Sequence, residues 1–426
     1  MKNISTHPTV RDTFFAPLTA ALQRSTYRRH CNEFSDEQFL KSGVGRVIEH
    51  VISGRDWVQR LRMKSAITVS VSNFFAALRS DRRLKMLDEI VHDVRTQADR
   101  LIAKSNDPLM AHPELDGFAV YATDGHTHGA SAHEKAIAGK KRPVTHIYSL
   151  NLRTQTLIPL ALSTPQAYKK KEHELSTLKR IGTEALRMNA PTGTRVIHVY
   201  DPAIVDYHQW YKWKQGNGIY ILTVEKANSA LTTIGQREWD VDDPRNTGIV
   251  SDEYVGPSNG VAIRRVTYVD PVTGKTFRFL TNVFKLPPGL IAFLYKLRWD
   301  VEKVFDQIKN KTFEQKAWAG NQTAKQQNAM FIALAHNLMK ILEVIIEHQE
   351  GITNQIPAPN RRARLAKEIS MANAAGRTPN PLVINWRRVT QICLQFIRWL
   401  RCVLDDSTSW RPAMKTLRPL MEEYLK

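Results

Sequence analysis

Hydrophobic positions in the first quarter of the chain recur at the three- and four-residue spacing of helices. Residues 1–110 therefore predict a mainly helical region. Within it, residues 65–83 fit a short turn that feeds a helix with Arg79, Arg82 and Arg83 near its end. A DNA-binding helix-turn-helix has this arrangement, and so does a packed helix with solvated arginines.

The period changes to that of strands in the middle of the chain. Three short runs rich in β-branched and aromatic residues precede a helix and a further such run. In order, these segments are Phe118–Thr123, His146–Leu152, Thr156–Leu162, the helix His173–Met188, and Arg195–Tyr200. Because a helical crossover brings the later strand parallel to an earlier one, the pattern predicts an α/β sheet. Asp124 and Asp201 each end one of these predicted strands.

Strand patterns continue to about residue 285, and helical patterns follow. Pro287-Pro288 introduces a helix predicted from Gly289 to Asn310, with further helices and a linker at 351–360 after it. The predicted organisation is a helical DNA-binding region (1–110), an α/β core (111–217 and 286–345), a β-rich insertion (218–285) and a helical C-terminal region (346–426).

Composition places the chain among globular proteins. Its 426 residues are 42% hydrophobic and 24% charged, which favours two or three packed regions over disorder. Three cysteines, mostly far apart, fit a reducing compartment rather than a disulfide framework. No apolar export segment opens the chain, and charged residues interrupt its most apolar stretch, residues 331–346. We therefore expect a cytoplasmic protein with no membrane partner.

Charge is the most informative part of the composition. The chain has 61 Lys and Arg against 41 Asp and Glu, a net charge of +20. This surplus divides about evenly among the N-terminal, middle and C-terminal regions, whereas a membrane-binding helix would concentrate it. A long polyanion that contacts all regions, and hence nucleic acid, either DNA or RNA, is the expected partner.

The helix predicted at 289–310 has one polar and one apolar face. Its polar face carries a tyrosine, an arginine, two acids and a lysine, namely Tyr295, Arg298, Glu302, Asp306 and Lys309. A solvated amphipathic helix explains such a face. A phosphate chain that passes a metal-binding carboxylate explains its mixture of charges.

Phosphodiester cleavage by divalent metal ions requires carboxylates from separate elements that meet at one point. Asp124 and Asp201 follow predicted strands at the edge where sites in such sheets lie, and the later helix can bring Glu302 to them. Asp-Gly and Asp-Pro pairs also favour turns, so each aspartate has a purely structural explanation as well.

The spacing Tyr295-x2-Arg298-x3-Glu302-x6-Lys309 resembles the Y-R-E-K signature of cut-and-paste DDE transposases of the insertion-sequence-four type. Asp124 and Asp201 resemble the first and second acids of that family. The resemblance covers roughly residues 115–345. The chain departs from the family pattern at His126 and at Pro202-Ala203, and Asp206 is the alternative second acid.

This resemblance implies a ribonuclease-H-like catalytic core interrupted by a β-rich insertion and flanked by helical regions. It implies that Asp124, Asp201 and Glu302 hold Mg2+, with Mn2+ as a substitute, for DNA cleavage and strand transfer. It further implies a hairpin intermediate and a homodimeric synaptic complex at the nucleoid, bound to double-stranded DNA at the terminal inverted repeats and at the target. The expected DNA-binding residues are Tyr295, Arg298, Lys309 and Trp239, the last by stacking on a base, although simple packing explains Trp239 equally well.

Other sites and functions remain open at this stage. His126, His128, His133 and Glu134 fit transition-metal ligands or a flexible loop. His208 and Trp210 lie near Asp201 in the sequence and fit DNA contacts. Burial of an aromatic side chain is the alternative explanation. A structure-selective nuclease without strand transfer and a non-catalytic DNA-binding repressor are the alternative functions.

Overall fold

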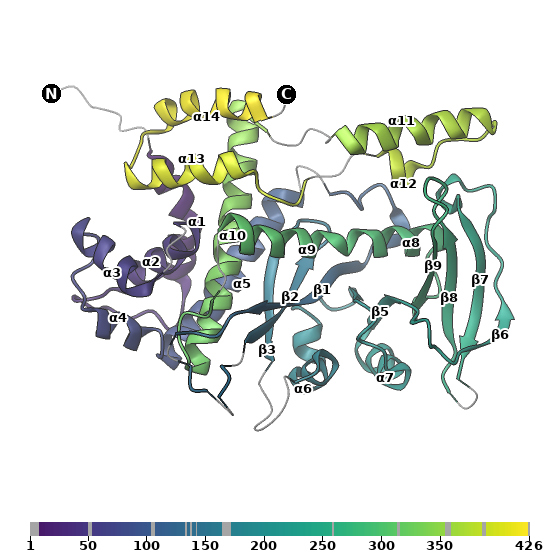
Figure 1. Cartoon of the computed structure of the whole chain (residues 1–426), viewed down its shortest axis with the longest axis horizontal. Helices are drawn as coiled ribbons and strands as arrows, with labels where there is room; N and C mark the ends of the chain where they lie inside the picture. Colours follow the sequence, from purple (N-terminus) through teal and green to yellow (C-terminus); the bar gives the residue numbers. More distant parts are fainter. Residues whose placement is uncertain are drawn as a thin grey trace.

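The computed structural model describes residues 8–49, 53–103, 107–132, 134–136, 139–141, 143–163, 172–257, 260–312, 316–353, 359–385 and 389–424. It has a mixed α/β architecture, in which helices flank both faces of one large sheet (Figure 1). The predicted α/β class with a ribonuclease-H-like core is confirmed.

The N-terminal region is helical, as predicted. Its helices are α1 (Val10–Arg24), α2 (Asp36–Ile48), α3 (Gly54–Met63), α4 (Val71–Ala77) and α5 (Asp81–Ala103). Hydroxyl side chains start several of them: Thr9 and Ser35 each form a reciprocal capping box, which satisfies backbone N–H groups of the first turn.

Two of the three arginines at the start of α5 have structural partners. Arg82 Nη2 lies 2.6 Å from a carboxylate oxygen of buried Asp36, and Arg83 Nε lies 3.2 Å from the same atom. Arg79 is exposed. Arg82, partly exposed, and Arg83, buried, therefore have a structural role, because they neutralise an acid that α2 buries.

A nine-stranded sheet runs through the molecule in the order β3-β2-β1-β4-β5-β9-β8-β7-β6. The strands are β1 (Phe118–His128), β2 (Val144–Asn151), β3 (Leu157–Ser163), β4 (Arg195–Val199), β5 (Ile219–Val224), β6 (Thr232–Gln236), β7 (Ile249–Gly256), β8 (Ile263–Val269) and β9 (Thr276–Thr281). β1 pairs in parallel with β4, and β4 with β5, while the remaining neighbours are antiparallel. The predicted crossover that makes β4 parallel to β1 is present.

The sheet is continuous across the boundary predicted at residue 218. β5 pairs with β4 on one side and with β9 on the other. Its residues were expected to open the insertion, but they form the fifth strand of the core, and β6–β9 extend the same sheet. Sequence patterns place a strand at β5 without indicating which strand it will pair with.

Helices cover both faces of the sheet. α6 (Glu174–Leu186) and α7 (Tyr207–Asn217) lie on one face, and α8 (Pro288–Leu297), α9 (Trp299–Asp306) and α10 (Gln322–Glu350) lie on the other (Figure 1). Short 3-10 turns occur at Pro113–Leu115 and Pro244–Asn246. Of the described helices, α10 alone is long and apolar enough to cross a membrane, yet 89% of its most apolar window is buried within the protein. It is the central core helix of the fold.

The C-terminal region divides between the two ends of the molecule: its last two helices pack together and against α1, and its first two lie beside the turn that follows β8, where Arg364 pairs with Asp270 at 3.0 Å (Figure 1). It comprises α11 (Pro359–Ala374), α12 (Pro381–Ile384), α13 (Leu394–Asp405) and α14 (Trp410–Tyr424). The backbone joins the two ends of the chain, because Thr9 forms a β-bridge with Ser409. Part of the predicted linker, residues 354–358, lies outside the described residues.

Candidate active site

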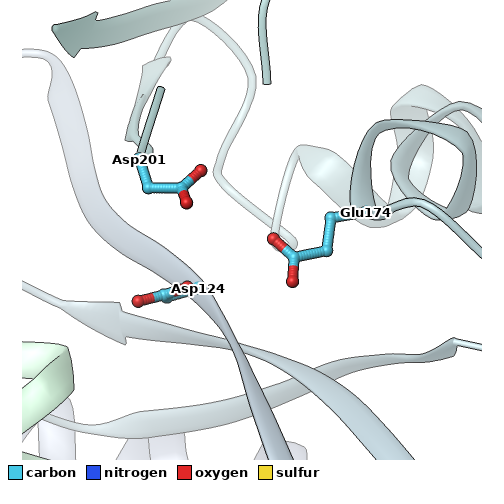
Figure 2. A group of neighbouring side chains, drawn as sticks. All are labelled: Asp124, Glu174 and Asp201. Atoms are coloured by element: carbon cyan, nitrogen blue, oxygen red, sulfur yellow. The ribbon is translucent and has the colours of Figure 1, made fainter. Parts of the chain in front are cut away.

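Three carboxylates from three different elements converge on one side of the core. Asp124 lies on β1, Asp201 directly follows Tyr200 at the end of β4, and Glu174 begins α6. One carboxylate oxygen from each lies within 4.8 Å of the other two (Figure 2). Because β1 and β4 are parallel neighbours with Ala122 opposite Val199, the two aspartates follow at matching positions.

Asp124 does not end its strand, contrary to the sequence prediction. β1 continues to His128, because β2 keeps pairing with it as far as His128 opposite Val144. β4 stops at Val199, so β1 loses its partner on that side just before Asp124. The Asp-Gly pair is therefore not a turn. Asp124 lies where β1 extends beyond the end of β4 and is paired with β2 alone.

The Asp124 carboxylate is mostly buried and makes two polar contacts. Its Oδ1 accepts a hydrogen bond from the Gly125 N–H at 2.7 Å, and its Oδ2 lies 3.4 Å from Arg298 Nη1. Burial raises the pKa of the Asp124 carboxyl to about 6; the charges of Asp201 and Glu174 add to the rise, and the Gly125 and Arg298 contacts oppose it. Without a cation nearby, ionisation of Asp124 beside the other carboxylates is therefore unfavourable.

Asp201 is fixed by the chain that follows it. Its Oδ1 accepts a hydrogen bond from the Ala203 N–H at 2.9 Å, and its backbone carbonyl accepts one from the Thr223 hydroxyl at 2.8 Å. The alternative acid, Asp206, has a different position: it caps α7 through the Gln209 N–H and pairs with Lys179 at 2.6 Å. The structure therefore brings Asp201, and not Asp206, into the group with Asp124.

Arg298 connects Glu302 to this group. Its Nη2 lies 2.7 Å from Glu302 Oε1, while its Nη1 faces Asp124. The Arg298 side chain is 7% exposed and the Glu302 side chain is 34% exposed. Glu302 is thus placed beside the site by an arginine that two carboxylates share.

The helix predicted at 289–310 is present. Arg298, the residue between α8 and α9, keeps helical dihedral angles (φ −53°, ψ −35°), so α9 continues directly from α8, and the segment ends in a π-helical turn, Gln307–Lys311. The predicted apolar face is correct, since Val301, Val304 and Ile308 are buried. Burial raises the pKa of Tyr295 above its usual range, so that its hydroxyl stays protonated. Lys309 is exposed on the π turn.

Sequence reasoning missed Glu174. The helix was predicted from His173, so an acid in its first turn was visible, and acids are common there because they complement the helix dipole. Its approach to the aspartates depends on how α6 packs on the sheet, which no local pattern encodes.

The histidines of β1 are packed in the core and do not form the flexible loop that was one expectation. His126 and His128 lie on the strand, with ring centroids 4.5 Å apart, and His128 and His146 rings are 5.6 Å apart. All three are buried, and burial lowers the pKa of His126 to about 3. Glu134 pairs with Lys325 at 2.9 Å. His133 lies outside the described residues.

The remaining aromatic candidates divide by exposure. Trp210 is buried, and its Nε1 donates a hydrogen bond to the Ile204 carbonyl at 3.1 Å, so it is a core residue. His208 is exposed on α7, and Trp239 is half-buried after β6 in the insertion.

The donor set at the carboxylates fits a divalent cation. Carboxylate oxygens are the hard ligands that Mg2+ and Mn2+ prefer, and here they come from a strand, a helix start and a strand end. Elements packed into one core hold such donors at fixed positions before a cation binds.

Comparison with known proteins gives two findings. Residues 48–338, more than half of the chain, match the family model described as "Transposase DDE domain". The chain is also 27% identical over 150 residues to y4zB of Sinorhizobium fredii, a protein whose name describes it as a candidate transposase. That similarity covers 34% of this chain and 42% of the relative.

Proposed function

The chain belongs to the transposase DDE domain family, and from that premise we propose that it cuts the ends of its own mobile element and joins them to target DNA. The observation that carries this proposal is the meeting of Asp124, on β1, with Asp201, just after the parallel neighbour β4, beside the Arg298–Glu302 pair. These acids come from elements far apart in the sequence, and turn formation alone gives no reason for them to meet.

Asp124, Asp201 and Glu302 would hold divalent Mg2+ ions, and Mn2+ would substitute for Mg2+. Bound there, such ions supply an activated oxygen nucleophile and neutralise charge on the leaving oxygen. Arg298 keeps the Glu302 carboxylate near Asp124 through its two-pronged guanidinium. It thereby holds these two acids in place before DNA binds.

The neighbouring residues position the DNA in this proposal. Lys309 is exposed and provides a cation for a phosphate, while Tyr295 remains a neutral hydroxyl that can donate a hydrogen bond to one. Trp239, half-buried in the insertion, provides a ring face for a base. Residues 1–110 and 346–426 supply further DNA and dimer contacts.

The Y-R-E-K spacing supports a place among transposases of the insertion-sequence-four type. From that resemblance we also propose a hairpin intermediate and a homodimeric complex on two element ends, formed at the nucleoid in the cytoplasm.

The test uses a labelled DNA fragment that carries the element end flanking the chain's own gene, incubated with plasmid DNA with and without Mg2+. We expect Mg2+-dependent cleavage followed by joining to the plasmid. Asp124→Asn, Asp201→Asn and Glu302→Gln should each lower cleavage by about a thousandfold or more while DNA binding persists. Asp206→Asn, the matched control on α7, should stay active.

The other outcomes identify the alternatives. Cleavage without joining would indicate a structure-selective nuclease. Binding with no cleavage in Mg2+, or in Mn2+ added in its place, would indicate a repressor. An inactive Asp206→Asn beside an active Asp201→Asn would reverse the assignment of the second acid.

A further inference from the structure

Glu174 has no role in the function proposed above, yet its carboxylate lies in the same group as Asp124 and Asp201. It is the first residue of α6, the helix that crosses from β3 to β4. Figure 2 shows its side chain reaching from the start of that helix toward the two aspartates.

Gly125 allows this approach. It sits inside β1 opposite Ile147, in ordinary strand conformation, so it does not serve a turn. A Cβ built there would lie 3.0 Å from Glu174 Cδ and closer still to Glu174 Oε1. Glycine in a strand interior often marks a place where another group comes close, and here the other group is the Glu174 carboxylate.

The arrangement brings like charges together at a cost. Asp124 and Asp201 already lie close together where the pairing of β1 with β4 ends. The Glu174 carboxylate, within 4.8 Å of both, adds repulsion. Arg298 offsets part of this repulsion at Asp124, and its other ion pair is with Glu302. A divalent cation bound between Asp124, Glu174 and Asp201 would attract all three carboxylates.

We propose that Glu174 is a fourth carboxylate ligand of the active site and holds the same divalent ion as Asp124 and Asp201. The inference rests on the proposed metal-dependent function. It assigns one ion to Asp124, Glu174 and Asp201, and it leaves Glu302, beside Arg298, for the second ion that the chemistry uses.

The experiment measures Mn2+ binding to the full-length protein without DNA, by titration with detection of free Mn2+ by electron paramagnetic resonance. Glu174→Gln keeps the size of the side chain and removes its charge. We expect it to weaken Mn2+ binding by about tenfold or more. Glu184→Gln, on the same helix but exposed, should bind Mn2+ as the unmodified protein does. Circular dichroism in EDTA checks that each variant folds.

A second variant tests the geometry with all four acids retained. Gly125→Ala places a methyl group against Glu174, so it should weaken Mn2+ binding in the same direction. Cleavage by Glu174→Gln should recover in part as Mn2+ is raised.

The two proposals can fail separately. Unchanged Mn2+ affinity in folded Glu174→Gln, with binding lost in Asp124→Asn, would overturn the role of Glu174 and leave the metal-dependent function standing. If the unmodified protein binds no Mn2+ but cleaves DNA in Mg2+, the role of Glu174 is overturned and the proposed function stands; if it neither binds Mn2+ nor cleaves DNA in Mg2+, both proposals are overturned.

Discussion

The Asp124 carboxyl, at the residue scale, is held in the folded protein at a cost in free energy, beside the carboxylates of Glu174 and Asp201. Its pKa rises from 3.8 to about 6 on folding, so the folded state favours the neutral acid. The stability this contributes is fully present below pH 3.8 and is lost as the pH rises through about 6. In EDTA at about pH 8, Asp124→Asn should therefore raise the free energy of unfolding by about 2 kcal/mol, measured by urea denaturation.

The same comparison at about pH 4 is the control, because folded Asp124 is then neutral and most of the gain should disappear. Adding Mn2+ at about pH 8 should stabilise the unmodified protein and not the variant. An Asn variant that is less stable than the unmodified protein at both pH values would show that the carboxylate is held by favourable contacts instead.

At the level of elements, the contact of α8 with the 3-10 turn Pro244–Asn246 sets the position of the helix that carries Arg298 and Glu302. The Gly289 N–H donates to Asn246 Oδ1 at 2.9 Å, and a Cβ at Gly289 would lie 2.6 Å from the backbone carbonyl carbon of Arg245. Backbone cannot yield as a flexible side chain can. Gly289→Ala should therefore destabilise the protein by about 2–3 kcal/mol in urea denaturation and slow cleavage by moving α8 and α9.

Gly216→Ala is the matched control. Gly216 lies in α7, a Cβ there meets nothing within 4 Å, and alanine favours helix. That substitution should be neutral or should stabilise the protein by up to about 1 kcal/mol. If the two variants unfold at the same urea concentration, the close approach between α8 and the 3-10 turn does not constrain the fold.

At the level of the whole molecule, the net charge of +20 sets how binding depends on salt. Each neutralised phosphate releases counterions, so a protein that contacts six or more phosphates should lose about a thousandfold in DNA affinity between about 50 and 200 mM salt. Fluorescence anisotropy with a labelled duplex measures this slope. We expect it to be steep for any duplex, because the surplus charge is spread over the chain.

Glu302→Gln is the control for this measurement, since it changes the active site and leaves the cationic surface in place. Its salt slope should match that of the unmodified protein. An affinity that hardly changes with salt would argue against DNA as the partner.

The sequence by itself determined the elements of this protein and much of its chemistry. Hydrophobic spacing predicted most helices and strands, because the period of a helix or strand is a local property. The buried face of Val301, Val304 and Ile308 follows from the same periodicity. The charge surplus and the Y-R-E-K spacing are also properties of the sequence alone, and they indicate a nucleic-acid partner and a DDE transposase without knowledge of the fold.

Only the tertiary structure decided which residues meet. β1 runs past Asp124 because β2 pairs with it, and β5 joins the core because β4 lies beside it. Arg82 and Arg83 point to Asp36 because α2 buries that acid. Glu174 reaches the two aspartates because α6 packs against β3 and Gly125 leaves room for the Glu174 carboxylate. Each of these outcomes depends on a partner distant in the sequence, and a local pattern carries no information about such a partner.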